Sequence, residues 1–329
     1  MRRAPSTGGI IEGGYDGLAV AGLVHREDVL RAAEVIRGRV RRTPTLTADA
    51  LGPGVRLKAE LFQHTGSFKP RGVLTKLASL TPEEKERGVI GISAGNHAQA
   101  LAWGAAQEGI DCLVVMISSS IRIKVEATRA YGAAIDMEAD DWVEGFARFD
   151  ELVATTGRTV VHPHRDPLVI AGQGTVGLEV EEDAPDASVV LVAGGGGGLS
   201  AGVAAALPEH RVVVVEPEGS AVIHASLQAG HPVAVMPVSI ADGLCTSYTA
   251  ETAIDVLREH GVESVLVSEA EIEDAFRWLY SRAKLACEPA GATALAPLLS
   301  GRIEPRSVAV VVSGGNVAAE TAAAILARS

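Results

Sequence analysis

Short apolar runs alternate with longer amphipathic stretches along most of the chain. Apolar residues at helical spacing predict helices, and short continuous apolar runs predict strands. Strands and helices that alternate this regularly form βαβ units on a parallel sheet, which is buried on both faces. The pattern occurs twice, before and after about residue 157, and so predicts two sheets. The predicted strands cover residues 56–61, 89–92, 111–117, 134–137, 159–161, 189–193, 211–216, 264–267 and 308–313. The predicted helices include residues 25–40, 97–108, 121–131, 142–155, 250–259, 271–286 and 317–327.

Composition narrows the range of functions. The chain has 329 residues, and its 41 acidic residues exceed its 29 Lys and Arg residues, which gives a net charge of −12. An acidic surface repels phosphate backbones and anionic lipid, so we expect no nucleic-acid or membrane partner. No apolar run approaches the roughly 18 residues that span a bilayer. The three cysteines form no CxxC pair, which disfavours a disulfide framework or a zinc site and fits a reducing cytoplasm.

Lys69 differs from the other lysines of the chain in its neighbours. It follows Phe68 and precedes Pro70, which suits the first turn of a helix. The positive end of a helix dipole disfavours an ammonium group at that position. A neutral amine in a partly apolar site is what Schiff-base chemistry requires. Taken alone, however, a surface lysine that enters a helix is the simpler interpretation.

The segment Ser93-Ala94-Gly95-Asn96-His97 joins a predicted strand to a predicted helix. A strand that passes through small residues into a helix directs backbone N–H groups at whatever occupies the turn. Asn96 and His97 add side-chain donors. The pattern indicates an anion site, although a helix cap without a ligand is also a frequent arrangement.

A run of five glycines extends from Gly194 to Gly198, directly after a predicted strand. Successive glycines lose much backbone entropy on folding, so a contorted or closely approached backbone must require them. A phosphate held by main-chain amides is the usual reason. Gly196, Gly198 and Ala201 also fit the G-x-G-x-x-A dinucleotide fingerprint, and Glu216 ends the next strand at about the expected distance. An NAD-dependent oxidoreductase and a glycine loop without a ligand therefore remain open here.

Ser313 ends the last predicted strand and precedes Gly314-Gly315-Asn316 and a helix. Ligands of open α/β sheets bind at the carboxyl ends of strands, which makes Ser313 a candidate binding residue. An ordinary strand-to-helix turn explains the segment equally well.

Together and in this order, these segments resemble the signature set of fold-type-II pyridoxal-phosphate enzymes. Within that group, the chain is similar to threonine/serine dehydratases and serine racemases from about Val24 to the C-terminus. The combination is much more specific than any one segment, and it disfavours the NAD interpretation. The resemblance rests on residues 65–72, 93–99, the glycine run before Leu199, and 313–316, with support from 42–44, 171–175, 242–244 and 288–291.

The resemblance implies a role for each candidate residue. Lys69, beside Phe68, would carry pyridoxal 5′-phosphate as a Schiff base and would then act as the base at Cα. Asn96 would bond to the 3′-oxygen of the cofactor, and Ser313 would meet its pyridine nitrogen. The phosphate would be held by the backbone of Gly195, Gly196, Gly197, Gly198 and Leu199. The substrate, a small amino acid, would bind at Ser67, Ser93, Ala94, Gly95, Asn96 and His97.

The resemblance also implies the architecture. We expect an α/β fold of the tryptophan synthase β-subunit type, with two open, twisted, mainly parallel sheets and the cofactor between two lobes. The large domain would comprise residues 25–85 and 156–329, and the small domain residues 86–155. Residues 1–24, which are Gly-rich and aperiodic, would form a flexible extension. We further expect a homo-oligomer, a dimer or a tetramer, in the cytoplasm.

The implied reaction is α,β-elimination. A small L-β-hydroxy amino acid, with threonine or serine first, would be converted to a 2-oxo acid and ammonia. A racemase or a β-replacement enzyme of the same family is an alternative, and a non-catalytic amino-acid sensor is another. The intact Lys69 argues against the sensor, because a sensor does not need a Schiff-base amine.

The chain departs from the family pattern at positions that bear on metal, stereochemistry and substrate. Ala94 stands where serine racemases have a serine that serves as a second acid/base, and an alanine methyl cannot transfer a proton. Val222 stands where a carboxylate would assist Glu216 in holding a divalent ion, so Glu216 is at most a partial metal site. Residues 245–250 are unlike the family pattern, which bears on the substrate. The other histidines, such as His162, His164 and His231, have no metal-ligand spacing and are interpreted as structural.

Overall fold

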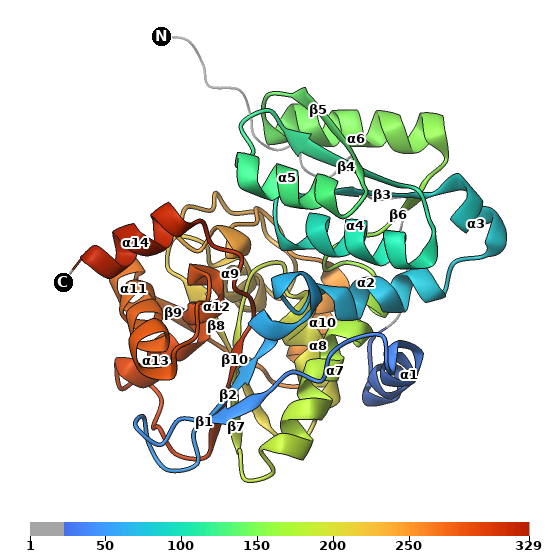
Figure 1. Cartoon of the computed structure of the whole chain (residues 1–329). Coiled ribbons are helices and arrows are strands. Elements are labelled where there is room, and N and C mark those ends of the chain that lie inside the picture. The colour runs from blue at the N-terminus through green and yellow to red at the C-terminus, as the bar shows by residue number, and fades with distance from the viewer. Residues whose placement is uncertain (1–22, 329) are drawn as a thin grey trace.

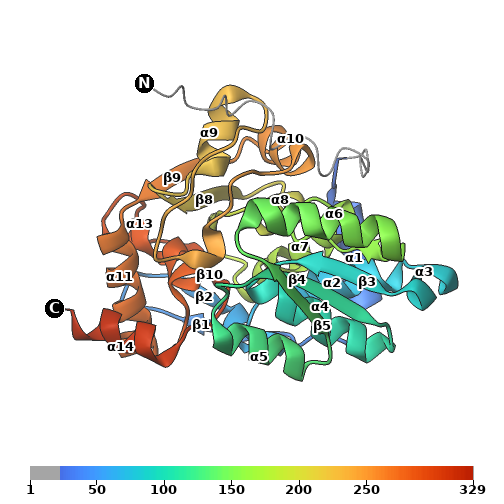
Figure 2. The same cartoon turned by 90° about the horizontal axis from the view of Figure 1, so that it is seen from above.

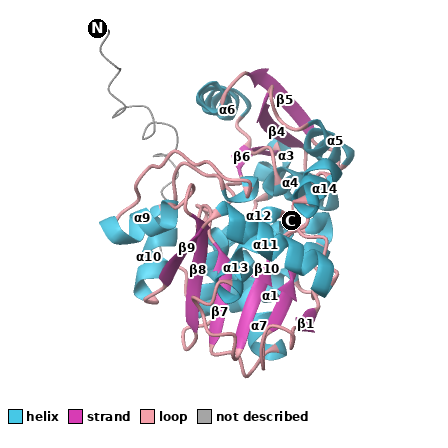
Figure 3. Cartoon of the chain, turned by 90° about the vertical axis from the view of Figure 1, so that its left-hand side faces the viewer, coloured by secondary structure: helices cyan, strands magenta, loops and turns pink. Residues whose placement is uncertain are grey.

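The valine-rich runs form the strands of the larger of two sheets in the computed structural model, which describes residues 23–328. All residues of its strand β10 are buried, as expected for a strand covered on both faces. Its strand order is β1–β2–β10–β7–β8–β9, and every neighbouring pair is parallel except β1 with β2 (Figure 3). The strands are β1 (Thr45–Thr47), β2 (Arg56–Ala59), β7 (Val189–Ala193), β8 (Arg211–Pro217), β9 (Glu263–Val267) and β10 (Val308–Val312).

The second sheet forms the core of a smaller lobe, inserted between α2 and α7 (Figure 1). Its four strands are parallel, in the order β5–β4–β3–β6. Phe149 of α6 packs with Ile90 and Val115 on one face of the sheet, and residues of α4 and α5 pack on the other (Figure 2). The strands are β3 (Val89–Ile92), β4 (Cys112–Ile117), β5 (Ala134–Ala139) and β6 (Thr159–Val160).

Helices cover both faces of the large sheet because successive strand residues point to opposite sides. In β7, Val190 and Val192 join the core that includes α1, α7, α8 and α10, whereas Leu191 and Ala193 join the core that includes α11 to α14. The helices are α1 (Arg26–Ile36), α2 (Lys69–Ala78), α3 (Pro82–Arg87), α4 (Asn96–Glu108), α5 (Arg122–Ala130), α6 (Trp142–Thr156), α7 (Pro167–Asp183), α8 (Gly198–Ala206), α9 (Val222–Ala229), α10 (Glu251–Glu259), α11 (Glu269–Trp278), α12 (Pro289–Ala292), α13 (Ala296–Leu299) and α14 (Ala319–Ala327).

Glycines of α7 let it approach its neighbours closely. A Cβ at Gly172 would lie 2.5 Å from the carbonyl oxygen of Arg71 on α2. A Cβ at Gly174 would lie 2.5 Å from the carbonyl oxygen of Gly202 on α8. Any larger residue would force these helices apart, and both α2 and α8 begin at residues that line the candidate site.

The structure corrects several predicted boundaries. The first helix ends at Ile36 rather than at residue 40. β6 pairs with β3, so the small sheet extends past residue 155, where we expected the small domain to end. Val24, the last residue of the predicted flexible extension, is buried in the core of the large lobe, so the extension cannot include it. Residues 1–22 lie outside the described residues. Within residues 23–328, no helix is long and apolar enough to cross a membrane.

Candidate active site

A cavity of about 620 Å³ lies between the two lobes. Ser93, Gly195 and Ser313, which come just after β3, β7 and β10, all line it. The cavity therefore opens at the carboxyl ends of strands from both sheets, where α/β folds bind ligands. We call it the catalytic cavity. Nearly all the predicted site residues line it: Phe68, Lys69, Ser93, Ala94, Gly95, Asn96, His97, Gly195, Gly196, Gly197, Gly198, Leu199 and Ser313.

Ser67 is the predicted substrate-binding residue that does not line this cavity. Its side chain is fully buried, and its hydroxyl has no hydrogen-bond partner among the described residues. Its backbone forms an antiparallel bridge with Gly314. This bridge joins the segment before α2 to the turn after β10, and the Phe68 amide also donates to the Ser313 carbonyl at 3.2 Å.

Lys69 is the first residue of α2, and Pro70 follows it as predicted. Its Nζ donates to the carbonyl oxygen of Pro163 at 3.2 Å and lies 4.9 Å from the centre of the Phe68 ring. Burial lowers the pKa of Lys69 from 10.5 to about 8, and the negative charge of Glu288 offsets only part of that effect. About a tenth of the amine is therefore neutral at pH 7 and about half at pH 8, far more than for an ordinary lysine, and Schiff-base formation requires the neutral amine.

The lowered pKa of Lys69 predicts how the cofactor-free protein captures pyridoxal phosphate. Only the neutral amine attacks an aldehyde, so the rate of capture should rise with pH up to about 8 and then level off. The measurement is the growth of visible absorbance after mixing, as a function of pH. A rate that keeps rising into the range of an ordinary lysine would contradict the assignment.

The turn from Ser93 to His97 begins α4, with Gly95 as its N-cap. The Ser93 hydroxyl accepts a hydrogen bond from the Gly95 amide at 3.2 Å, which shapes the turn. The Nε2 of His97 donates to the Val161 carbonyl at 2.7 Å, so this N–H is not available to an anion at the turn. Burial and the nearby Lys69 lower the pKa of His97 to about 3, so the ring is neutral. The helix N-terminus, rather than the imidazole, supplies the attraction for an anion.

Asn96 is held by two partners. Its Nδ2 donates to Oε1 of Glu288 at 2.6 Å, and its Oδ1 accepts from Nδ2 of Asn316 at 2.8 Å. One hydrogen of Nδ2 remains for the predicted bond to a cofactor oxygen. Glu288 is buried, and burial raises its pKa to about 7 despite the Asn96 hydrogen bond. The sequence singled out residues 288–291 only as a supporting motif, so it missed Glu288 as a partner of Asn96.

The glycine run is a cradle that side chains would fill. A Cβ at Gly196 would lie 2.3 Å from Nδ1 of His164, and one at Gly198 would lie 3.0 Å from its Cβ. Gly197 has a φ of +89°, which other residues rarely adopt, and it caps the N-terminus of α8. The first amides of a helix lack partners within the helix and point outward. Together these features suit the binding of an anion at the start of α8.

His162 and His164 also line the catalytic cavity, a placement that their interpretation as structural residues did not anticipate. Nδ1 of His162 accepts from the amides of His164 and Arg165, which leaves the ring proton on Nε2 to donate to the Tyr248 hydroxyl at 3.1 Å. Burial lowers the pKa of His164 to about 3 and that of His162 well below its usual value. Both rings are neutral. Their sequence neighbours gave no sign of this placement, since Gly196 and Tyr248 come from distant segments.

Glu216 is buried near the end of β8, and its carboxylate binds the first turn of α9. Its carboxylate oxygens accept from the amides of Ile223 and His224, the second and third residues of α9, at 2.8 and 2.7 Å. Burial raises its pKa to about 7, although these hydrogen bonds oppose the shift. No group of three potential metal ligands occurs among residues 23–328.

This arrangement predicts that activity does not depend on a divalent ion held at Glu216. We expect a strong chelator to change kcat by less than about twofold, because hard cations need several oxygen ligands and Val222 offers none at the expected second position. The comparison is turnover before and after chelation, with Mg²⁺ added back. Strong inhibition that Mg²⁺ reverses would contradict the prediction.

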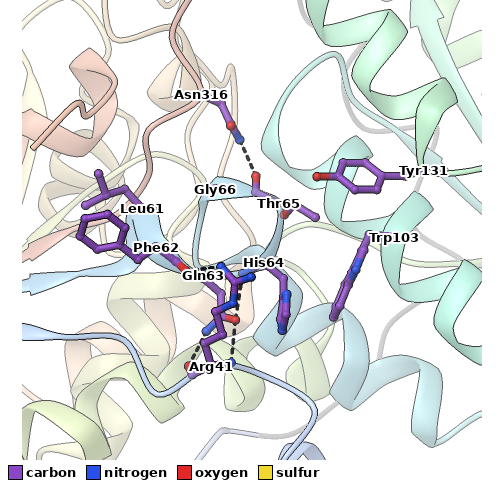
Figure 4. Close-up of a pocket in the computed structure, with 10 residues that line it drawn as sticks. All are labelled: Arg41, Leu61, Phe62, Gln63, His64, Thr65, Gly66, Trp103, Tyr131 and Asn316. Atoms are coloured by element: carbon purple, nitrogen blue, oxygen red, sulfur yellow. Dashed lines mark hydrogen bonds between the residues drawn. The ribbon is translucent and has the colours of Figure 1, made fainter.

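A second cavity of about 500 Å³ is lined by Thr65, Gly66 and Asn316, which are close in sequence to Lys69 and Ser313 (Figure 4). The rings of His64 and Trp103 stack in its wall with centroids 4.7 Å apart. Nδ2 of Asn316 donates to the Thr65 carbonyl at 2.7 Å as well as to Asn96. Hydrogen bonds from Asn316 to Thr65 and to Asn96 therefore link the two cavities. Lys69 lines only the catalytic cavity.

The residues present fit pyridoxal phosphate. A lysine with a lowered pKa, a glycine cradle at a helix N-terminus and the neutral Ser313 hydroxyl lie around one cavity between two lobes. The cradle would hold the phosphate, Lys69 the aldehyde carbon and Ser313 the ring nitrogen. Fold and site together thus define a pyridoxal-phosphate enzyme of fold type II.

Comparison with known proteins agrees with this class. The family model described as pyridoxal-phosphate dependent enzyme matches residues 36–314, and the chain belongs to this family. This confirms the predicted family, fold class and cofactor, and an enzyme of the lyase type, and it excludes the NAD alternative.

Three relatives illustrate the similarity. The chain is 38% identical to an L-threonine ammonia-lyase of Thermotoga maritima, over 90% of this chain and 76% of the relative. The structure of maize serine racemase superimposes with a TM-score of 0.86 and 32% identity, over 91% of this chain and 96% of that one. The structure of a threonine deaminase from T.th. gives a TM-score of 0.84 and 38% identity, over 89% of this chain and 99% of that one.

Proposed function

We propose that the protein is an ammonia-lyase that converts L-threonine or L-serine to a 2-oxo acid and ammonia. The observation that carries the proposal is the placement of Lys69, with its lowered pKa, in one cavity with a phosphate cradle and an anion-binding turn. Relatives named threonine ammonia-lyase and threonine deaminase support the reaction type.

In this proposal, each part of the cavity has one task. When bound, pyridoxal phosphate supplies an electron sink for the negative charge that develops at Cα of the substrate. The start of α4 binds the substrate carboxylate with backbone amides, and Lys69 removes the Cα proton. The β-hydroxyl leaves with a proton as water, and water then hydrolyses the unsaturated amine to the 2-oxo acid and ammonia. Ser313 can only hydrogen-bond the ring nitrogen, which favours prompt loss of the β-substituent over amino transfer.

The direct test is release of 2-oxo acid by the cofactor-loaded protein. We expect stoichiometric 2-oxo acid and ammonia from L-threonine or L-serine. Yellow, loaded protein that releases neither product from any β-hydroxy amino acid would reject the proposal.

Stereochemistry provides an independent prediction. Racemisation requires a second acid/base on the face opposite Lys69, and Ala94 cannot provide one. We therefore expect D-serine to form from L-serine at least about 100-fold more slowly than the 2-oxo acid. Chiral chromatography of the reaction mixture gives this ratio. Comparable rates would favour the racemase alternative.

The proposal includes a homo-oligomer in the cytoplasm. The described cysteines are all unpaired, which suits a reducing compartment. Closed symmetric assemblies are the usual form of metabolic enzymes, and sedimentation would establish the number of subunits.

A further inference from the structure

Part of the wall of the catalytic cavity is formed by residues to which the proposed function assigns no role. Beyond the residues assigned to cofactor and carboxylate, its wall includes Trp142 and Phe146 from α6 of the small lobe. Pro237, Leu244 and Tyr248 come from the large lobe. We call these five residues the apolar wall. A substrate bound at the turn before α4 and at Lys69 must direct its β-substituent into the remaining space of this cavity.

Trp142 and Phe146 form one aromatic surface in that wall. They are one helical turn apart, and their ring centroids lie 6.4 Å apart with an angle of 42° between the rings. Trp142 is 41% exposed, so much of its apolar surface remains for a ligand to cover. Aromatic rings gain stabilisation from covered area and from contact with other rings.

The charged side chains that line the cavity beside this wall already have partners, and Arg165, whose charge acts on Tyr248, does not line the cavity. Lys124 of α5 donates to the carboxylate of Asp242, and Glu288 accepts from Asn96. The imidazoles of His162 and His164 are neutral. A charged β-substituent would therefore lose its water without gaining a counter-ion, which is unfavourable.

From these contacts we infer the substrate class, on the basis of the proposed ammonia-lyase function. The apolar wall is a side-chain subsite for L-β-hydroxy amino acids whose Cβ carries an apolar group larger than methyl, such as phenyl or isopropyl. A single added methylene in an apolar subsite changes kcat/KM by about 10–200-fold. Phenylserine and 3-hydroxyleucine are therefore better substrates than threonine, and 3-hydroxyaspartate is worse.

A substrate panel tests the inference with the cofactor-loaded full chain. We expect kcat/KM for L-threo-phenylserine and 3-hydroxyleucine to exceed that for L-threonine by about tenfold or more, and 3-hydroxyaspartate to fall below threonine by a similar factor. If threonine is turned over and the two apolar substrates are poorer, the subsite is wrong and the proposed function stands. If no β-hydroxy amino acid releases a 2-oxo acid, both are wrong.

Variants of the apolar wall test whether it causes the preference for apolar β-substituents. Trp142→Ala and Phe146→Ala should each lower the phenylserine-to-threonine ratio of kcat/KM by about tenfold. Val143→Ala is the matched control, because Val143 lies beside Trp142, is 62% exposed and does not line the cavity. An unchanged ratio in both aromatic variants, or an equal fall in the control, would overturn the assignment.

Binding supplies a readout without turnover. L-Phenylalanine and L-alanine lack the leaving hydroxyl, so calorimetry can compare their dissociation constants. L-Phenylalanine should bind about tenfold more tightly than L-alanine, and this difference should largely disappear in Trp142→Ala. Tighter binding of L-alanine to the wild-type protein would contradict the subsite.

Discussion

Replacement of Lys69 by alanine is expected to lower kcat by about 10⁴-fold or more and to leave the protein without its Schiff base. In the proposed function, the variant loses both the amine that would hold the cofactor and the base that would take the Cα proton. Lys69 also has no substitute nearby, since Lys124, the other lysine that lines the catalytic cavity, is paired with Asp242. Turnover assays and visible absorbance measure the two losses.

Reduction with borohydride locates the linkage. In the wild-type protein, the cofactor should become fixed to the peptide that contains Lys69. Lys85→Ala is a matched control, because Lys85 forms an ion pair with Glu108 away from the cavity and should retain both colour and activity. Label on any other lysine, or a Lys69→Ala variant that remains fully active, would refute the site.

A buried ion network adjoins the catalytic helix α2. Arg71, two residues after Lys69, is 1% exposed and donates from Nε and Nη2 to both oxygens of Glu60 at 2.8 Å. It also donates to both oxygens of Glu179 on α7, at 2.7 and 3.0 Å. Lys58, fully buried on β2, binds Glu179 at 2.7 Å and the Thr43 carbonyl at 2.8 Å. These bonds tie α2 to the large sheet and to α7.

Arg71→Met is expected to lower the free energy of unfolding by about 3–5 kcal/mol, because it leaves Glu60 buried without its cation. Chemical denaturation and the change in Tm measure the loss. The double variant Arg71→Met/Glu60→Met should recover part of it, since an apolar pair needs no counter-charge.

An exposed pair provides the comparison for this variant. Arg211 forms a two-bonded pair with Glu263, and the two side chains are 48% and 53% exposed. Arg211→Ala should change the free energy of unfolding by no more than about 1 kcal/mol. If Arg71→Met lowered the free energy of unfolding by only as much as Arg211→Ala, burial would not increase the contribution of the ion network beside α2 to stability.

The local hydrophobic pattern was sufficient to predict those strands and helices whose own residues favour that structure. The predicted strands at residues 89–92 and 189–193 match β3 and β7 residue for residue, because each is a short apolar run ended by small residues. β1 was not predicted, since Thr45–Thr47 has no apolar period and becomes a strand only by pairing with β2. The segments that line the cavity were found because each is a local motif at the end of a strand.

Contacts between distant segments could not be predicted in this way. His164 enters the cavity wall because a loop from the end of the small lobe passes over Gly196. Lys58 is buried against Glu179, which lies far along the chain, and nothing in its sequence neighbours predicts this contact. Such pairs arise from the packing of α7 on the sheet, and a single sequence carries no local sign of them.

The strand order of the large sheet has a consequence for synthesis on the ribosome. β10 lies between β2 and β7, so β2 has only β1 beside it until almost the whole chain has been made. The strands β3 to β6 are consecutive in the chain and can pair much earlier. The small sheet can therefore form first, whereas β2 and β7 have no strand between them until β10 has been synthesised. Because Ser313 follows β10 directly, the catalytic cavity and the large sheet are completed in the same late event.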